Sequence, residues 1–176
     1  MTIEQRLDRT LRTIPDFPKP GIMFKDITPV LEDPILCQDL IKDFISKLDG
    51  TKIDAIVGVE SRGFLFGLPL AMALNVPFVT VRKKGKLPYK TVSYSYDLEY
   101  GSAEIEMHKD SVQKGWNVLV HDDLLATGGT AAAAAELIKM EGGHVAGFSF
   151  LIGLAFLEGG KKLSKYSENI VSTIEY

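Results

Sequence analysis

Four short apolar runs limit the folds open to this chain of 176 residues more than any other feature. They lie at residues 53–59, 77–82, 117–121 and 144–152, and valine, leucine, isoleucine and phenylalanine dominate them. Near-continuous apolar runs of this length are typical of strands buried on both faces, as in a parallel sheet. Helical segments, at about 66–75 and 130–141, separate some of these runs. We therefore predict an α/β fold with a central, mostly parallel sheet flanked by helices.

The N-terminal segment predicts two helices and a loop. Residues 3–14 carry apolar side chains at helical spacing after a capping box formed by Thr2 and Gln5. Residues 17–21 contain two prolines and a glycine, so they should form an extended loop. A second helix should begin at the Asp33 cap, which a proline follows.

Residues 91–107 have a different pattern. Apolar and aromatic side chains alternate with polar ones on both sides of a turn signal at 100–102. This alternation predicts a hairpin, or two strands that flank a mobile loop.

Composition excludes several classes of protein. No repeat, low-complexity tract or linker divides the chain, so we expect a single domain. No apolar run approaches the roughly 18 residues that cross a bilayer, and the polar N-terminus does not resemble a signal peptide. The lone Cys37 excludes an intramolecular disulfide and is interpreted as a buried structural thiol. Together these features predict a cytoplasmic protein that does not bind membranes. The net charge of −3 provides no overall basic field to bind nucleic acid.

The most specific motif is the segment 122–130, between the run 117–121 and five alanines that should open a helix. Its two glycines let backbone N–H groups approach an anion, its threonines add hydroxyl donors, and the helix directs its positive end to the same place. No lysine follows the glycines, which excludes a Walker loop. The residues expected to anchor a phosphate are Ala126, Thr127, Gly128, Gly129 and Thr130.

Asp122 and Asp123 open the same segment. Paired carboxylates accept hydrogen bonds from vicinal hydroxyls, whereas bare neighbouring charges would repel each other. A diol site beside a phosphate site describes a ribose 5-phosphate. An ordinary strand-to-helix turn can also contain two glycines, but two acids and two threonines within nine positions favour the ligand site.

The sequence VLVHDDLLATGGT (118–130) resembles the phosphoribosyl pyrophosphate signature of type I phosphoribosyltransferases, in the form carried by the members that act on adenine. The resemblance extends over nearly the whole chain. It implies the type I phosphoribosyltransferase fold, with a small N-terminal hood at roughly 1–32 plus the C-terminal segment, and a mobile hairpin loop. Members that act on 6-oxopurines usually have an aspartate, thought to act as a base, where this chain has Ala126.

The resemblance implies an adenine site in the hood. The sequence PDFPKPGIMFKDITPVL (15–31) resembles the hood of the adenine-specific members. On this match Phe24 stacks on the purine, the backbone of Met23 contacts the base edge, and Lys25 lies beside it. Leu154 matches an apolar residue that packs against the other face of the base.

The resemblance also implies a pyrophosphate site. Ser61 and Arg62 match the pyrophosphate loop of the family, and a guanidinium can donate two parallel hydrogen bonds to phosphate. Arg82, Lys83 and Lys86 match a basic loop that reaches the pyrophosphate of the neighbouring subunit, which implies a homodimer.

Leu98-Glu99-Tyr100-Gly101 matches the catalytic loop. The resemblance makes Glu99 the acid/base group for adenine N7, which would replace the aspartate missing at Ala126. Tyr100 would help to close the site, and Arg62 is the third residue that we expect to take part in catalysis. Three residues depart from the family pattern, namely Lys25, His121 and Gly153, and His121 is interpreted as a satisfied core or strand-end histidine.

The expected reaction transfers the 5-phosphoribosyl group from 5-phosphoribosyl 1-pyrophosphate to adenine and gives AMP and pyrophosphate. Mg²⁺ is the expected cofactor, held by substrate oxygens and water without a direct protein ligand. One alternative is transfer to a different purine base. Another is a non-catalytic regulator that senses phosphoribosyl pyrophosphate, but the first 30 residues offer one short helix and a proline-rich loop, with no helix-turn-helix.

Overall fold

The computed structural model describes residues 1–98 and 100–176 and contains a seven-stranded sheet in the order β5-β6-β4-β3-β7-β8-β9. The neighbours among β4, β3, β7, β8 and β9 pair in parallel. At one edge of the sheet, β6 pairs antiparallel with both β4 and β5. The predicted α/β fold is therefore confirmed, as is the predicted hairpin. The strands are β3 (Ala55–Val59), β4 (Phe78–Lys83), β5 (Thr91–Asp97), β6 (Ser102–His108), β7 (Asn117–Leu125), β8 (His144–Gly153) and β9 (Ile170–Glu175).

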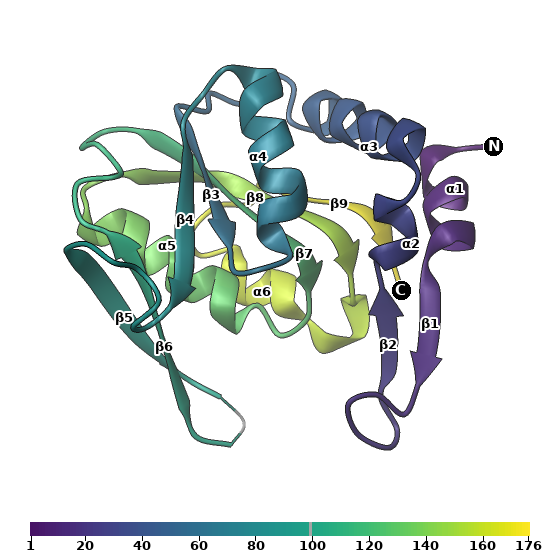
Figure 1. Ribbon diagram of the computed structural model, residues 1–176. Coiled ribbons are helices and arrows are strands. Elements are labelled where there is room, and N and C mark those ends of the chain that lie inside the picture. The colour runs from purple at the N-terminus through teal and green to yellow at the C-terminus, as the bar shows by residue number, and fades with distance from the viewer. Residues whose placement is uncertain (99) are drawn as a thin grey trace.

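Helices cover both faces of this sheet (Figure 1). One apolar core lies between the sheet and the helices α1, α3 and α4, and the other lies between the sheet and α5 with α6. The alanine run of α5 is buried because small side chains let that helix lie close to the strands. The helices are α1 (Ile3–Thr10), α2 (Thr28–Leu31), α3 (Pro34–Lys47), α4 (Gly63–Leu74), α5 (Gly129–Met140) and α6 (Gly159–Leu163), with a 3₁₀ turn η1 (Ala155–Leu157). Among the described residues, no helix is long and apolar enough to cross a membrane.

The N-terminal segment corrects one prediction. The helix expected over 3–14 ends at Thr10, and β1 (Arg12–Pro15) pairs antiparallel with β2 (Met23–Asp26) in a separate two-stranded sheet. Leu11 and Ile14 continue the helical spacing, but pairing with a distant strand overrides that local pattern. Residues 17–21 lie in a loop, as predicted, and this loop connects the two strands.

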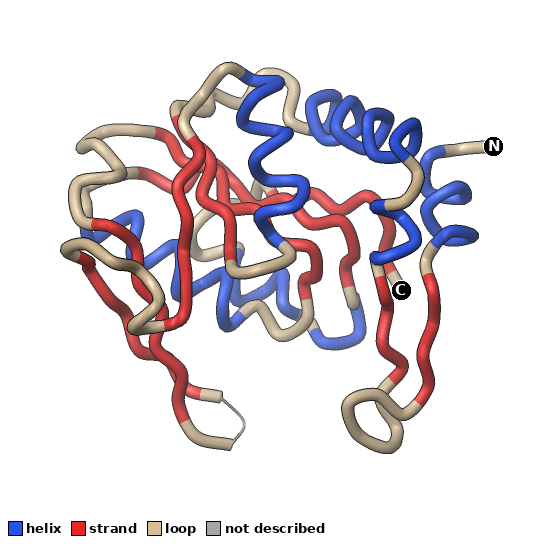
Figure 2. Tube along the Cα trace, in the orientation of Figure 1, coloured by secondary structure: helices blue, strands red, loops and turns tan. Residues whose placement is uncertain are grey.

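Both hairpins stand at the same edge of the molecule. The arrowheads of β3, β4, β7 and β8 lie at one edge of the main sheet, and the β1–β2 and β5–β6 hairpins extend on that side (Figures 1 and 2). In sheets of this type, ligands bind beyond the carboxyl ends of the strands. The two hairpins therefore flank the edge at which a ligand is expected.

His121 is buried in the core just before the acid pair, with none of its surface exposed. Its Nδ1 lies 2.8 Å from the Ser149 hydroxyl, and its ring meets Phe44 edge-on at 5.3 Å. Within the described chain its Nε2 has no hydrogen-bond partner. The expected core histidine is thus confirmed, although only one ring nitrogen is satisfied. Burial lowers its pKa to about 3, so the ring is neutral at physiological pH.

This neutral histidine predicts acid sensitivity. The unfolded chain binds a proton at His121 below pH 6.5, whereas the folded protein does not until about pH 3. Stability should therefore be lost as the pH falls through this window, at about 1.4 kcal/mol per pH unit. Urea unfolding between pH 7.5 and 4 measures how steeply the free energy of unfolding depends on pH, and this dependence should be weaker in His121→Asn. His144→Asn, at an exposed histidine, is the control, and an unchanged slope in His121→Asn would contradict the prediction.

Candidate functional site

The segment between β7 and α5 departs from the expected turn at its start. β7 continues to Leu125, so Asp122 and Asp123 lie on the strand, and only the residues from Ala126 to Gly128 form the turn. Gly128 has φ +78°, and a Cβ there would lie 2.8 Å from the Gly159 carbonyl oxygen. Glycine is required at this position because the turn is left-handed and α6 lies against it.

The α5 N-terminus behind this turn has no side-chain cap. The first amide groups of a helix have no partners within the helix, and here a side chain does not supply one. The described turn therefore offers N–H donors and the positive end of a 12-residue helix to an anion. Thr127 is exposed and Thr130 is half-buried beside it.

The two acids of β7 have unusual electrostatics. Burial and the neighbouring Asp123 raise the pKa of Asp122 well above its usual value. Burial also raises the pKa of Asp123, which is 4% exposed, although the Arg62 guanidinium opposes that effect. Two carboxylates held this close in a buried site favour a ligand that donates hydrogen bonds to both.

Arg62 connects three parts of the site. Its Nε lies 2.8 Å from the Asp123 carboxylate, and its guanidinium carbon lies 5.3 Å from the ring centre of Phe24 in β2. The loop that carries Arg62 approaches β7 closely because Gly63 has no side chain. A Cβ on Gly63 would lie 2.9 Å from the carbonyl oxygen of His121. The hood, the β3–α4 loop and the acid pair therefore meet at one point.

A cavity of about 340 Å³ opens at this point. It brings together residues predicted from three separate motifs: the acid pair for the ribose, and the Arg62 loop and the basic loop for the pyrophosphate. Its lining consists of Glu60, Ser61, Arg62, Lys83, Asp122 and Asp123.

Glu60 organises the basic residues beside this cavity. Its carboxylate lies 3.2 Å from Arg82 Nη2 and 3.4 Å from Lys86 Nζ, and it accepts a hydrogen bond from the Lys83 backbone N–H at 2.8 Å. Burial raises the pKa of Glu60, but these hydrogen bonds outweigh burial and hold it below its usual value. The sequence analysis gave Glu60 no role, although its place directly after a buried strand was an available signal.

Glu106 shapes the loop that carries the same cations. It is 4% exposed and lies opposite Arg82 on the neighbouring strand. Its carboxylate accepts hydrogen bonds from the backbone N–H groups of Gly85 and Leu87, at 3.0 and 3.1 Å, and from the Thr91 hydroxyl. Nothing in the sequence pattern distinguished this glutamate from an exposed one.

The hood residues have different environments. Phe24 is half-buried and meets Phe17 edge-on at 5.0 Å, whereas the Met23 side chain is exposed. Met23 lies opposite Pro15 in the strand pair. Because proline has no N–H, Pro15 cannot donate a hydrogen bond to the Met23 carbonyl. The Lys25 ammonium is 3.8 Å from the ring centre of Tyr176 and 3.1 Å from the Thr13 hydroxyl, so it faces the C-terminus in this structure.

Tyr176 joins the hood to the main sheet, a role that sequence reasoning missed. Its hydroxyl donates to Asp8 on α1, and its backbone pairs with Gly153 and Ala155 on either side of Leu154. The predicted hood segments from the two ends of the chain are therefore in contact. Leu154 is half-buried and packs against the core on the α3 and α4 face.

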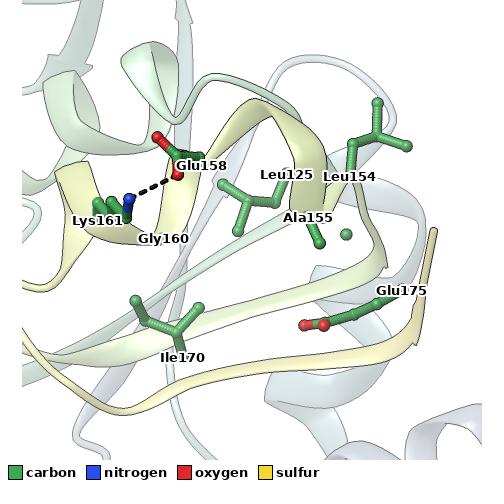
Figure 3. A pocket seen from close by; sticks show the side chains of 10 residues that line it. Leu125, Leu154, Ala155, Glu158, Gly160, Lys161, Ile170 and Glu175 are labelled. Carbon is green, nitrogen blue, oxygen red and sulfur yellow. Dashed lines mark hydrogen bonds and ion pairs between the residues drawn. The ribbon is translucent and has the colours of Figure 1, made fainter.

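A second cavity, of about 350 Å³, is lined by the ends of β7 and β8, by the segment from η1 to α6, and by β9 (Figure 3). Leu125, Ile170 and Ala155 line it, with Glu175 and the Glu158–Lys161 ion pair at its polar margin. Leu154 extends away from Leu125 and Ile170 in Figure 3, toward the opposite face of the sheet. This cavity and the cavity at the acid pair share none of their lining residues.

The predicted catalytic loop lies at the tip of the β5–β6 hairpin. Glu99 is outside the described residues. Its neighbours Leu98 and Tyr100 are 50% and 84% exposed, and the Leu98 N–H donates to the Gly101 carbonyl. In the described chain no three His, Cys, Asp or Glu side chains gather in a metal-binding arrangement.

Comparison with known proteins identifies relatives over almost the full length. The family model for the phosphoribosyl transferase domain matches residues 28–174. The adenine phosphoribosyltransferase of Cytophaga hutchinsonii is 52% identical over 174 residues, which cover 99% of this chain and 96% of the relative. That of Agathobacter rectalis is 58% identical over 161 residues, covering 92% of each chain.

Solved structures agree with these relatives. The crystal structure of the adenine phosphoribosyltransferase from Thermoanaerobacter pseudethanolicus has a TM-score of 0.95 at 51% identity, over 99% of this chain and 100% of that one. The Saccharomyces cerevisiae enzyme, solved in complex with an imino-altritol bisphosphate and adenine, has a TM-score of 0.90 at 42% identity, over 97% and 98% of the two chains.

Proposed function

Because the chain belongs to the phosphoribosyl transferase family, we propose that the cavity at the acid pair is where it transfers a 5-phosphoribosyl group to adenine. Adenine N9 attacks the anomeric carbon of 5-phosphoribosyl 1-pyrophosphate, the bond from that carbon to the pyrophosphate oxygen breaks, and AMP and pyrophosphate result. The convergence of the acid pair, Arg62 and Lys83 on one cavity carries this assignment, and the uncapped turn 126–128 follows the acid pair at the end of the same strand.

The ribose 5-phosphate is assigned to β7 and the turn that follows it. Backbone N–H groups between Ala126 and Thr130 bind the 5′-phosphate at the positive end of α5. Asp122 and Asp123 accept hydrogen bonds from the 2′ and 3′ hydroxyls and lie near the positive charge that develops on the sugar. Their raised pKa values support this role because a hydrogen-bond donor relieves the repulsion between them.

Pyrophosphate is assigned to the cationic side of the cavity, with Ser61 and Arg62. In the proposed homodimer, Arg82, Lys83 and Lys86 would reach the pyrophosphate of the neighbouring subunit, and Lys83 also lines the cavity of its own chain. Arg62 pairs with Asp123 and lies over the Phe24 ring. Turning toward the pyrophosphate would free Asp123 for the ribose and expose Phe24 to the purine. Binding of the leaving group would thereby prepare both other subsites.

Adenine is assigned to the space between Phe24 and Leu154. A half-buried aromatic ring supplies stacking energy, and the Met23 carbonyl opposite Pro15 is available to the base edge. Lys25 contributes by holding Tyr176, which fixes the hood against the strand end that carries Leu154. Glu99 is assigned the exchange of the proton at adenine N7, and Tyr100 is assigned to close over the base.

Mg²⁺ is the proposed cofactor. The acid pair offers carboxylate oxygens, but Arg62 holds one of these groups, so the residues present suit an ion that also keeps water and substrate oxygens. Such an ion would neutralise charge on the pyrophosphate as it leaves. Asp122 and Asp123 would orient its waters.

We further propose a homodimer of single-domain subunits in the cytoplasm. Leu65, Leu68 and Met72 form an exposed apolar stripe along α4, 43%, 47% and 72% exposed, directly after the Arg62 loop. Pairing through this stripe would bring a second copy beside the pyrophosphate residues. The single cysteine, whose thiol donates to Val30 and whose pKa burial raises, is compatible with a reducing compartment.

Turnover with different bases tests the function. We expect AMP from adenine and phosphoribosyl pyrophosphate in the presence of Mg²⁺, with kcat/KM for hypoxanthine and guanine lower by about 10²-fold or more, because polar groups matched to one base edge are left unpaired by another. Product formation by chromatography measures this. Equal turnover of the oxopurines would favour the alternative base specificity, and no turnover of any base would favour the non-catalytic regulator.

A further inference from the structure

Tyr96 joins the hairpin that carries the proposed catalytic loop to the phosphate turn. Its hydroxyl oxygen lies 3.0 Å from Thr130 Oγ1. Its ring lies against Gly129, where a Cβ would sit 3.7 Å from the ring carbon Cδ2. The residue is half-buried near the end of β5, and its ring packs against the core beneath α5.

Tyr96 also borders the space between two proposed subsites. A cavity of about 180 Å³ is lined by Tyr96 and Thr130 on one side and by Asp122, Arg82 and Lys83 on the others. The tyrosine therefore lies among groups assigned to the phosphate, the ribose and the pyrophosphate.

The hydrogen bond between Tyr96 and Thr130 can have either hydroxyl group as its donor, and the two arrangements have different consequences for an anion at the turn. A threonine hydroxyl has one hydrogen to donate and can accept as well. If the Tyr96 phenol donates to Thr130 Oγ1, the hydrogen of Thr130 remains available for another acceptor. In the reverse arrangement, Thr130 would use its only hydrogen on the tyrosine and would present lone pairs to an incoming anion.

We propose that Tyr96 is a positioning residue that directs the Thr130 hydroxyl hydrogen toward the 5′-phosphate, a role that rests on the proposed function of the turn. It acts through Thr130 and not by contact with the reacting atoms.

Tyr96→Phe tests this role because it removes the hydroxyl and keeps the ring against Gly129. The KM for phosphoribosyl pyrophosphate and the Kd for ribose 5-phosphate should rise about threefold to tenfold, the effect of one lost hydrogen bond. The KM for adenine and the kcat should change less than about twofold because neither depends on the phosphate hydrogen bond. Steady-state kinetics and calorimetry with ribose 5-phosphate measure these values.

Tyr94→Phe is the matched control. Tyr94 lies on the same face of β5 two residues earlier and packs against the same core, so loss of its hydroxyl should leave the KM for phosphoribosyl pyrophosphate unchanged. Thr130→Val should weaken ribose 5-phosphate binding by itself, and adding Tyr96→Phe to it should have no further effect. In Thr130→Ser, which keeps the hydroxyl, the effect of Tyr96→Phe should persist.

Three outcomes would overturn the role of Tyr96: an unchanged Kd in Tyr96→Phe, an equal rise in the KM for adenine, or additive effects in the double variant with Thr130→Val. Each of these is separable from failure of the proposed function. If the wild-type protein does not bind ribose 5-phosphate, the assignment of the turn itself is wrong. If the wild-type protein binds it and Tyr96→Phe binds it equally well, only the inference about Tyr96 fails.

Discussion

Replacing Asp122 with asparagine should make the protein more stable at neutral pH and lower kcat/KM by about a hundredfold or more. The loss of activity follows from removing a negative group assigned to the ribose hydroxyls and to the developing cation. The gain in stability follows from the raised pKa of Asp122, which burial and the charge of Asp123 cause. The amide oxygen of asparagine can still accept the Asp123 N–H, which lies 2.8 Å from Asp122 Oδ1.

The pH dependence of the free energy of unfolding distinguishes the loss of a buried charge from a stabilisation that is the same at every pH. In the unfolded chain Asp122 loses its proton near pH 3.8, whereas the folded protein keeps it to a higher pH. The wild type therefore loses stability as the pH rises between these two values, and the deficit is complete above the pKa of the folded state. Asp122→Asn should gain more stability at pH 8 than at pH 4, as measured by urea unfolding.

Asp49→Asn is the control for net charge, because Asp49 is exposed and does not line the cavity at the acid pair. Its free energy of unfolding should change by no more than about 0.5 kcal/mol at either pH. If the Asp122→Asn variant is less stable than the wild type at pH 8, the two acids do not repel each other in the folded protein. Unchanged kcat/KM would remove Asp122 from the ribose site.

Replacing Glu99 with glutamine should lower kcat by about a hundredfold or more, the usual effect of losing a general acid or base. The variant keeps the size of the side chain and loses its ability to exchange a proton with adenine N7. Ala126 cannot substitute, because its side chain carries no ionisable group. Binding of ribose 5-phosphate should remain within about twofold of the wild type, since the phosphate turn is unaltered.

Glu104→Gln is the matched control on the same hairpin. Glu104 lies on β6 and pairs with Lys84 at 2.8 Å, so its replacement should cost only the small energy of an exposed ion pair and leave kcat unchanged. Single-turnover measurements separate the chemical step from product release. Wild-type kcat in Glu99→Gln would require another group to handle the proton.

Much of the scaffold was predictable from local pattern. The four apolar runs became four of the five parallel strands, because burial on both faces requires continuous apolar sequence. The glycines, threonines and acids at 122–130 indicated a phosphate and ribose site, since the chemistry of those residue types is independent of the fold around them. The fifth parallel strand, β9, carries serine and threonine within its short run and gave no comparable signal.

Contacts between distant segments were decided by the tertiary structure. Leu11 and Ile14 continue a helical pattern, yet pairing with β2 places the residues after Thr10 in a strand. The sequence analysis gave Glu60 and Glu106 no role, but packing turns both carboxylates toward the basic loop. The contact of Tyr96 with Thr130 joins residues 34 positions apart, and that of Tyr176 with Asp8 joins the two ends of the chain.

The sequence by itself predicted which groups are suited to bind anions, accept hydrogen bonds from hydroxyls and stack on a ring, together with the order of most of the strands and helices that carry them. The tertiary structure decided which of these groups meet, how buried the acids are, and which cation each acid holds. The physical reason is that residue chemistry and local periodicity are properties of short segments. Desolvation and charge pairing depend on the distances between segments that only the folded chain brings together.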